Sequence, residues 1–414
     1  MLAPASHHQA VDMFWRAAGH FCNQIREAAL ARDANTFADL IARVARFARD
    51  RLVPAEAQVA ASDAMPEDII DEMRQLGLFG MTLPQAYGGL ALKASEEVRL
   101  VFELCWAAPA FRAYVGANNS LGGRAILWGG SDAQRAHYLP RIASGKLVTA
   151  FALTEPGSGS DAAALETRAW RREDGCWVIN GSKRFITGAP EADLINVVAR
   201  TDPHSSGGQG VSILLVERGT PGLVQSPPDR KMGQHGMHTG DLYFDNCVVP
   251  ADALLGEEGK GFRLTMRTID RGRLHIASAC VGLAARLIHE SLRYALERRQ
   301  SGRPIAEFQL LQAMLADSQA DYLAARSLVL QTAMRCDDAE EISMDASCCK
   351  LFASEMVSRV ADRAVQIFGG AGYMHGSAVQ RLYRDARVYR IYEGTTQIQQ
   401  ITIAKHLIRK TAKT

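Results

Sequence analysis

A single carboxylate near the C-terminus has the setting of a general base. Residues 391–397 read IYEGTTQ, so Glu393 lies on a loop between an aromatic-rich run and a new amphipathic segment. A dry, well-aimed carboxylate can remove a weakly acidic proton with little help from other side chains. A glutamate in a loop is, however, usually exposed to solvent. The motif therefore predicts a base only if other segments supply something for the carboxylate to face.

Three further segments carry residue types that suit a bound cofactor. Residues 154–161 read TEPGSGSD, and such a turn lets backbone N–H groups approach a pyrophosphate or a flavin edge. Phe185 and Thr187 lie two apart, so in a strand they face the same side and can flank an aromatic ring. Residues 366–370 read QIFGG at the end of a helical run. Each segment also has an ordinary alternative, namely a solvent loop or a strand buried against its neighbours.

The elements that must position these residues change along the chain. Residues 36–150 have a helical pattern with Ala-rich stretches, which predicts an N-terminal α-helical domain. Residues 151–260 contain short β-rich runs and predict a middle antiparallel β-domain. These runs are 176–179, 194–198, 211–216 and 242–244. Asn180-Gly181 after the first run predicts a tight hairpin turn.

The helical period returns after residue 260. Apolar stripes predict three helices around 274–296, 311–329 and 349–367, and a fourth around 398–408. The fold class predicted is therefore α+β and multidomain, with a C-terminal four-helix bundle at 261–414. Residues 1–35 form an N-terminal extension that we expect to be helical or to bind a partner.

A Rossmann arrangement is excluded. The glycines at 157–159 and 369–372 lack the third glycine of G-x-G-x-x-G at its place, and no β-α-β alternation surrounds them. If a dinucleotide binds, it binds in another way.

The composition excludes several classes of function. The 414 residues carry a net charge of +2 without a Lys/Arg run, so neither nucleic acid nor a membrane is favoured as a partner. No apolar run could span a bilayer, and the start lacks the order of a secretory signal, so we expect a cytoplasmic protein. The eight cysteines show no C-x-x-C pair, so we expect no metal site and no disulfides, and interpret them as small buried residues.

The four motifs, at 154–161, 183–187, 366–370 and 392–395, resemble those of the acyl-CoA dehydrogenase family, in the same order and over about residues 36–410. These are FAD-dependent flavoproteins of fatty-acid and amino-acid oxidation. The resemblance implies α,β-dehydrogenation of an acyl-CoA to the trans-2-enoyl-CoA. Glu393 would remove the α-proton while the β-hydrogen leaves as hydride to flavin N5. It also implies an electron-transferring flavoprotein as acceptor and a homotetramer.

The resemblance assigns the remaining site residues. FAD would contact Phe151, Leu153, Thr154, Gly159, Ser160, Phe185, Ile186, Thr187, Arg298, Gln309, Gln366, Gly369, Gly370, Thr395 and Gln397. The substrate would contact Ser160, Asp270, Arg273 and Gly394. Arg298 would reach the pyrophosphate of a neighbouring subunit's FAD, although a basic helix end is also often just solvated. Phe185 stands where relatives commonly have Trp, and Ser301 replaces a usual Phe, so flavin and adenine packing are expected to differ.

Gly272 decides between two places for the base. Some relatives carry their catalytic carboxylate on the helix beside the arginine equivalent to Arg273, where this chain has Gly272. Of the two positions at which the family carries its catalytic base, only the C-terminal loop then has a carboxylate in this chain, and this is Glu393.

Arg112 bears on the substrate. It stands where glutaryl-CoA dehydrogenases hold the distal carboxylate of their substrate, so a dicarboxylyl-CoA is one hypothesis. The sequence favours the other, an arginine paired with protein acids or solvent, because much of the glutaryl pattern is missing. Two rival functions also remain open: an acyl-CoA oxidase or flavin monooxygenase on the same fold, and a helical scaffold without chemistry.

Overall fold

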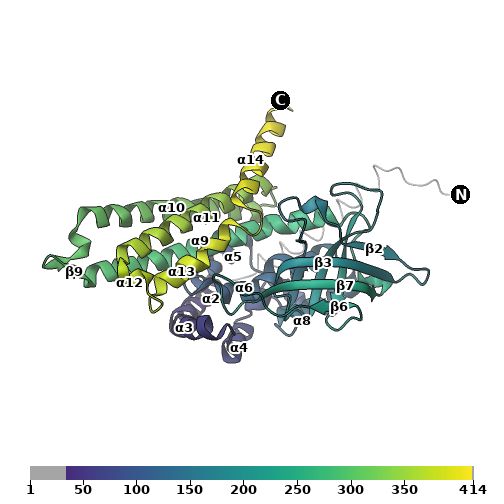
Figure 1. Cartoon of the computed structure of the whole chain (residues 1–414), viewed down its shortest axis with the longest axis horizontal. Coiled ribbons are helices and arrows are strands. Elements are labelled where there is room, and N and C mark those ends of the chain that lie inside the picture. Colours follow the sequence, from purple (N-terminus) through teal and green to yellow (C-terminus); the bar gives the residue numbers. More distant parts are fainter. Residues whose placement is uncertain (1–33, 413–414) are drawn as a thin grey trace.

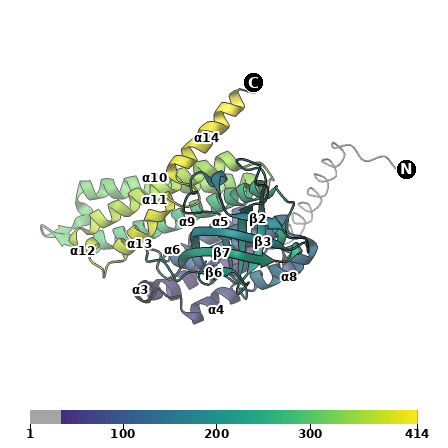
Figure 2. The same ribbon diagram turned by 45° about the vertical axis from the view of Figure 1, so that its right-hand side comes forward.

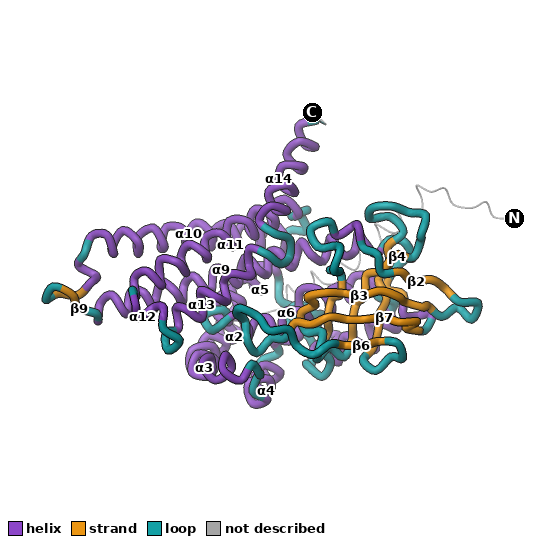
Figure 3. The backbone as a smooth tube through the Cα atoms, viewed as in Figure 1, coloured by secondary structure: helices purple, strands orange, loops and turns teal. Residues whose placement is uncertain are grey.

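In a computed structural model of the chain, residues 34–412 are described. A bundle of long helices extends to one end of the molecule, a β-sheet lies at the other, and shorter N-terminal helices pack beneath them (Figure 1). The tube in Figure 3 shows the same separation of helical and sheet regions. The predicted order of helical, β and helical parts is confirmed.

Short helices form the N-terminal part. They are α2 (Ala34–Phe47), α3 (Val53–Ser62), α4 (Glu67–Gln75), α5 (Ala94–Leu104), α6 (Pro109–Gly116), α7 (Gly122–Gly129) and α8 (Asp132–Ala143). A π-helical turn, Ala117–Leu121, joins α6 to α7. Its Asn118 accepts hydrogen bonds from the backbone N–H and the hydroxyl of Thr149, at 2.8 and 2.9 Å. These bonds attach the helical part to the first strand of the sheet.

Within the described residues the sheet has eight strands and is mainly antiparallel. The strands are β1 (Thr149–Ala152), β2 (Arg168–Arg171), β3 (Trp177–Thr187), β4 (Leu194–Arg200), β5 (Val211–Glu217), β6 (Leu223–Gln225), β7 (Thr239–Val249) and β8 (Leu254–Leu255). Their order is β6-β7-β3-β2-β4-β5-β8, with β1 beside β4. The pairings of β4 with β1 and with β2 are parallel, which the predicted antiparallel domain did not include.

The hairpin predicted at Asn180-Gly181 is wrong. Both residues lie inside β3, where the pairing with β7 shifts register. The Asn180 side chain accepts from the Asn246 N–H at 2.7 Å, so it bridges to β7 instead of closing a turn. Gly181 is needed at φ 143° because an added Cβ would lie 2.8 Å from the Thr167 Cα. Long pairing with β7 outweighs the local turn preference.

The C-terminal part is built on long helices. They are α9 (Gly261–Glu297), α10 (Gln309–Asp337), α11 (Ser343–Phe368), α12 (Gly370–Tyr373), α13 (Ala378–Ala386) and α14 (Thr396–Thr411). Two short strands, β9 (Arg299–Gln300) and β10 (Arg303–Pro304), form a hairpin after α9. The predicted helix at 398–408 is α14, but it projects from the body in both views, and the sequence prediction missed α13 (Figures 1 and 2).

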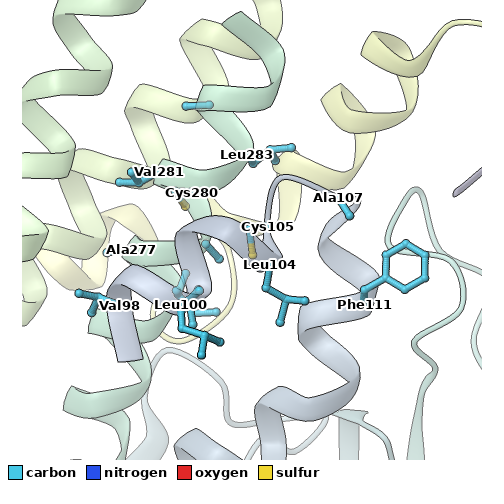
Figure 4. Close-up of a cluster of buried hydrophobic side chains, with 14 of the residues drawn as sticks. Val98, Leu100, Leu104, Cys105, Ala107, Phe111, Ala277, Cys280, Val281 and Leu283 are labelled. Atoms are coloured by element: carbon cyan, nitrogen blue, oxygen red, sulfur yellow. The ribbon is translucent and has the colours of Figure 1, made fainter. Parts of the chain in front are cut away.

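The main core joins the N-terminal helices to the bundle. Figure 4 shows α5 and α9 facing each other through Leu104, Cys105, Ala277 and Cys280, all essentially unexposed. This apolar seam fixes α9 against the N-terminal part, so that a residue on α9 has a defined position relative to α6.

The expectations for cysteines, membrane spans, metal sites and the N-terminal extension can be compared with the described residues. Of the described cysteines none forms a disulfide, and Cys105, Cys247, Cys280 and Cys349 are buried, but three others are partly exposed. Among the described residues no helix is long and apolar enough to cross a membrane, and no cluster of three His, Cys, Asp or Glu could hold a metal ion. The extension at 1–35 lies, apart from the first two residues of α2, outside the described residues.

Candidate active site

The loop that carries Glu393 has a strained backbone. It joins a short 3-10 turn, Arg387–Arg390, to α14, where the Ile398 N–H donates to the hydroxyl of the N-cap residue Thr395. Glu393 has φ 54° and Gly394 has φ 86°, two successive residues in the left-handed region. Left-handed φ is uncommon for a residue with a Cβ and persists where the surroundings enforce it.

The Glu393 carboxylate packs against the bare backbone of Gly272 on α9. A Cβ added to Gly272 would lie 2.8 Å from Oε2 and 3.1 Å from Oε1 of Glu393. The two alternative positions for a base, which are 121 residues apart by their numbers 272 and 393, therefore converge on one point in space. The absence of a side chain at 272 makes room for the carboxylate from the loop.

Two buried side chains that the sequence analysis missed hold the backbone of this loop. Lys350 on α11 donates through Nζ to the Gly394 carbonyl at 2.6 Å. Gln399 on α14 donates through Nε2 to the carbonyls of Glu393 and Gly394, both at 3.0 Å. Lys350 and Gln399 are completely buried. A lysine inside the Ala/Cys-rich stretch 346–353 was the available signal for the first of them.

The electrostatics leave Glu393 poised between its two protonation states. Burial raises the pKa of its carboxyl to about 7, against the lowering effects of Arg273, then Arg112, then Lys350. A carboxyl with a pKa near the working pH is suited to proton transfer in either direction.

This shift predicts a pH-dependent stability. Between its ordinary pKa of 4.5 and the folded value of about 7, Glu393 holds more protons in the folded than in the unfolded chain. Its contribution to the free energy of unfolding therefore falls as the pH rises through that window. Because glutamine cannot ionise, Glu393→Gln is expected to raise the Tm at pH 8 and to leave it nearly unchanged at pH 5, as measured by thermal unfolding of the FAD-loaded protein.

Glu355 provides a control of opposite sign. Its hydrogen bonds to Thr396 and Arg390 outweigh burial and lower the pKa of its carboxyl. Glu355→Gln should therefore lose more stability at pH 8 than at pH 4. An equal Tm shift for Glu393→Gln at both pH values would contradict the raised pKa.

The predicted substrate residues on α9 lie beside the loop. Arg273 is buried and donates through Nη1 to Asp270 at 2.8 Å and to Ser347 at 3.2 Å. A Cβ added to Gly394 would come within 3.7 Å of its Nη2. Asp270, Arg273, Gly394 and Glu393 are thus brought together by the structure.

Arg112 on α6 approaches the same loop from the other side. It is 4% exposed, donates through Nη2 to the Tyr392 hydroxyl at 3.1 Å, and its Nε has no hydrogen-bond partner. No carboxylate in the described part of the chain forms an ion pair with it. The hydrogen bond of Arg112 is thus to a tyrosine hydroxyl, and the Glu393 carboxylate affects it only through the longer-range interaction described above.

The Gly/Ser-rich turn is held by a buried ion pair. Lys183 on β3 donates to Glu155 at 2.7 Å, and the Thr154 carbonyl accepts from the Arg184 N–H at 2.8 Å. Gly159 and Ser160 are exposed on the turn, and a Cβ added to Gly159 would lie 3.9 Å from the Cγ2 of Thr154. The predicted residues Thr154, Gly159 and Ser160 therefore lie together.

Phe185 marks the adjoining face of the sheet. It sits at the second register shift of β3 with φ 57°, and its ring is 61% exposed beneath the guanidinium of Arg184. Ile186 is buried and Thr187 partly exposed. Because Phe185 lies at a bulge, where the regular alternation of sides is interrupted, its sharing a side with Thr187 stays a prediction. Phe151 and Leu153, on and after β1, are also partly exposed. An uncovered aromatic face next to a turn of small residues fits a flavin, whose ring would cover it.

The remaining predicted FAD contacts do not join this group. Arg298, Gln309, Gln366, Gly369 and Gly370 are all exposed near the β9 hairpin. That hairpin lies at the end of the bundle away from the β-sheet in both views (Figures 1 and 2). Thr395 and Gln397 lie at the start of α14. One chain therefore presents two separated sets of predicted cofactor residues.

Known proteins resemble the chain over nearly its whole length. Models of the acyl-CoA dehydrogenase N-terminal, middle and C-terminal domains match residues 36–146, 150–247 and 259–408. The 3-(aryl)acrylate reductase of Clostridium sporogenes is 39% identical over 372 residues, 90% of this chain and 98% of that protein. The caffeyl-CoA reductase-Etf complex subunit CarC of Acetobacterium woodii is 38% identical over 373 residues, with the same coverage. The solved structure of butyryl-CoA dehydrogenase from Megasphaera elsdenii matches with a TM-score of 0.88 at 34% identity, covering 91% of this chain and 99% of that one. The chain therefore belongs to the FAD-dependent acyl-CoA dehydrogenase family of oxidoreductases.

Proposed function

We propose that the protein dehydrogenates an acyl-CoA thioester to the trans-2-enoyl-CoA, with Glu393 as the base that removes the α-proton. The observation that carries this proposal is the carboxylate of Glu393, partly buried, packed on the bare backbone of Gly272 and with its pKa raised to about 7. Such a group is ionised often enough to accept a proton at neutral pH, and basic enough to hold it.

The same loop offers a donor for the thioester oxygen. The α-proton becomes acidic only if the negative charge that develops on this oxygen is stabilised. The backbone N–H of Glu393 has no hydrogen-bond partner in the described part of the chain, so it is free to donate there. Bound FAD supplies the acceptor for the β-hydride.

FAD would be held by two subunits. We propose that the turn at Thr154, Gly159 and Ser160, with Phe185 and Thr187, holds the flavin half. Arg298, Gln309, Gln366, Gly369 and Gly370 would hold the adenine half of a neighbouring subunit's FAD. The separation of these sets in one chain supports a homo-oligomer, which we propose to be a tetramer. The projecting helix α14, with Ile401, Leu407 and Ile408 exposed, supports the same assembly.

The names of the relatives favour a second direction for the same chemistry. A reductase adds a proton and a hydride to a 2-enoyl group, and microscopic reversibility lets Glu393 donate the proton that it would otherwise remove. Its pKa of about 7 allows either state at neutral pH. The relative in a reductase-Etf complex also supports an electron-transferring flavoprotein as the redox partner.

Anaerobic reduction of the flavin by a panel of acyl-CoAs tests the proposal. Bleaching of the oxidised flavin band by at least one acyl-CoA, followed by electron transfer to an electron-transferring flavoprotein, is expected. Rapid reoxidation by oxygen instead would favour the oxidase alternative. Reoxidation of the reduced enzyme by a 2-enoyl-CoA reports the reverse direction. No bleaching by any member of the panel would contradict the proposal.

Arg112 indicates which acyl group is used. A guanidinium that is almost completely buried, with an unpartnered Nε and no ion pair to a carboxylate of the described chain, is costly unless a ligand supplies the anion. We therefore propose an acyl group with a second carboxylate, which Arg112 and the Tyr392 hydroxyl would bind.

This proposal predicts a reversal of substrate preference. The wild-type protein should be reduced faster by glutaryl- or pimeloyl-CoA than by butyryl- or octanoyl-CoA. Arg112→Met should lower kcat/KM for the best diacid by about 100-fold, the typical cost of breaking a buried charge pair. It should spare or raise the value for butyryl-CoA. Wild-type activity on neutral chains alone would end the diacid proposal without affecting the role of Glu393.

A further inference from the structure

Lys350 differs from the other completely buried lysine of the described chain. Lys183 has a carboxylate partner, Glu155, at 2.7 Å. Lys350 forms no ion pair within the described residues, and its one hydrogen bond is to the Gly394 carbonyl. A buried ammonium without a carboxylate is unfavourable for folding. Stability therefore does not explain a lysine at this position, which points to another role.

The position of that carbonyl suggests the role. Gly394 directly follows Glu393, and its carbonyl accepts from Lys350 and Gln399 at the same time, using both of its lone pairs. Gln399 also binds the carbonyl of Glu393 itself. The two residues whose carbonyls are held in this way, Glu393 and Gly394, are the two residues of this loop with left-handed φ angles. Without these donors the loop would be free to relax toward ordinary backbone angles, which would carry the carboxylate away from Gly272.

We propose that Lys350, together with Gln399, is a positioning residue that locks the strained loop so that the carboxylate of Glu393 points at the substrate. The inference rests on the proposed function of Glu393. Lys350 acts from α11 through the backbone and does not itself touch the substrate.

The charge of Lys350 adds a second, separable effect. The charged or titratable groups that face Lys350 are Cys280 and Arg273 on α9, Glu393 on the loop and Glu355 on α11. Those that face Glu393 are Arg273, Arg112 and Lys350, all of which lower the pKa of its carboxyl. Removing the ammonium should therefore raise the pKa of Glu393, whereas removing Gln399 should leave it unchanged.

The test compares Lys350→Met, Lys350→Arg and Gln399→Met by stopped-flow reduction of the FAD-loaded protein with its best acyl-CoA between pH 5.5 and 9. Lys350→Met should lower the plateau rate at least about tenfold, as expected for a misplaced base, and shift the apparent pKa upward. Its Tm should be equal to or above that of the wild type. Lys350→Arg should keep the wild-type pKa and recover part of the rate. Gln399→Met should lower the rate without shifting the pKa.

Controls separate this inference from the proposed function. Lys146→Met makes the same change at an exposed lysine in the turn after α8 and should behave as wild type. If Glu393→Gln is inactive while Lys350→Met keeps the wild-type rate and pH profile, the inference is wrong and the proposed function stands. If wild-type flavin is bleached by no acyl-CoA, both are wrong. If Lys350→Met does not bind FAD, the Gln399→Met variant tests the inference instead. An unchanged rate of flavin reduction in Gln399→Met would then contradict the proposed positioning of the loop.

Discussion

Glu393→Gln is expected to give a yellow, folded protein whose flavin is no longer reduced by any acyl-CoA. Glutamine has nearly the same shape as glutamic acid, so the contact with Gly272 should be preserved. The backbone bonds from Lys350 and Gln399 reach the loop carbonyls and do not involve the side chain that is changed. Only the proton acceptor is lost.

The size of the effect follows from the role. A positioned general base contributes about 10²–10⁴-fold to a rate. Because the three atoms nearest to a Cβ added at Gly272 all belong to the Glu393 carboxylate, we expect the rate of flavin reduction to fall by at least about 10³-fold when this base is lost. The wild-type rate should rise with pH through a transition near 7, where the carboxyl ionises, and this transition should be absent from the residual rate of the variant.

Two measurements show whether the Glu393→Gln variant loses activity because it fails to bind FAD or substrate. The FAD content must match that of the wild type, and addition of acyl-CoA must still perturb the flavin spectrum, because binding does not need the base. Retained bleaching of the flavin at a rate within about tenfold of wild type would refute Glu393 as the base.

The sequence indicated those parts of the candidate site that depend only on residue types and on their spacing along the chain. The IYEGTTQ motif singled out Glu393, and the glycine at 272 excluded a base on the helix. The packing of the carboxylate against that glycine is known from the structure alone. The order of helical and β parts followed from the change in periodicity. These signals are local, so they can be read without knowing the fold.

The sequence did not predict what depends on contacts between distant segments. Lys350 meets the Gly394 carbonyl across 44 positions of the chain. A lysine in an Ala/Cys-rich helix indicates burial, but it does not indicate which group the lysine contacts. The hairpin expected at Asn180 failed because pairing along the whole of β3 outweighed a two-residue preference. The burial of Arg112 without an acid could not be predicted either, since it is a property of everything packed around α6.

Gly272→Ala should make the protein more stable and less active. Alanine is favoured over glycine inside a helix by about 1 kcal/mol, and Gly272 lies in the interior of α9. The new Cβ would, however, come 2.8 Å from Oε2 of Glu393, closer than two such atoms can approach. The flexible end of the glutamate can move aside, so folding is spared, but the base is displaced. A displacement of about 1 Å can cost on the order of 100-fold in rate.

A double-mutant cycle with Glu393→Asp tests this explanation, because aspartate is one methylene shorter and withdraws its oxygens from the space that the Cβ would fill. Glu393→Asp alone should be slow, but Gly272→Ala should cost it much less than it costs the wild type, giving a coupling of opposite sign to the two single effects. Gly376→Ala is the matched control, since a Cβ added there meets nothing within 4 Å. The measurements are the stopped-flow rate of flavin reduction and the Tm for all four members of the cycle. Strictly additive losses in rate would show that Gly272 does not act through the carboxylate of Glu393. A fall in Tm for Gly272→Ala would show that the added methyl group distorts the helix and does not simply displace the base.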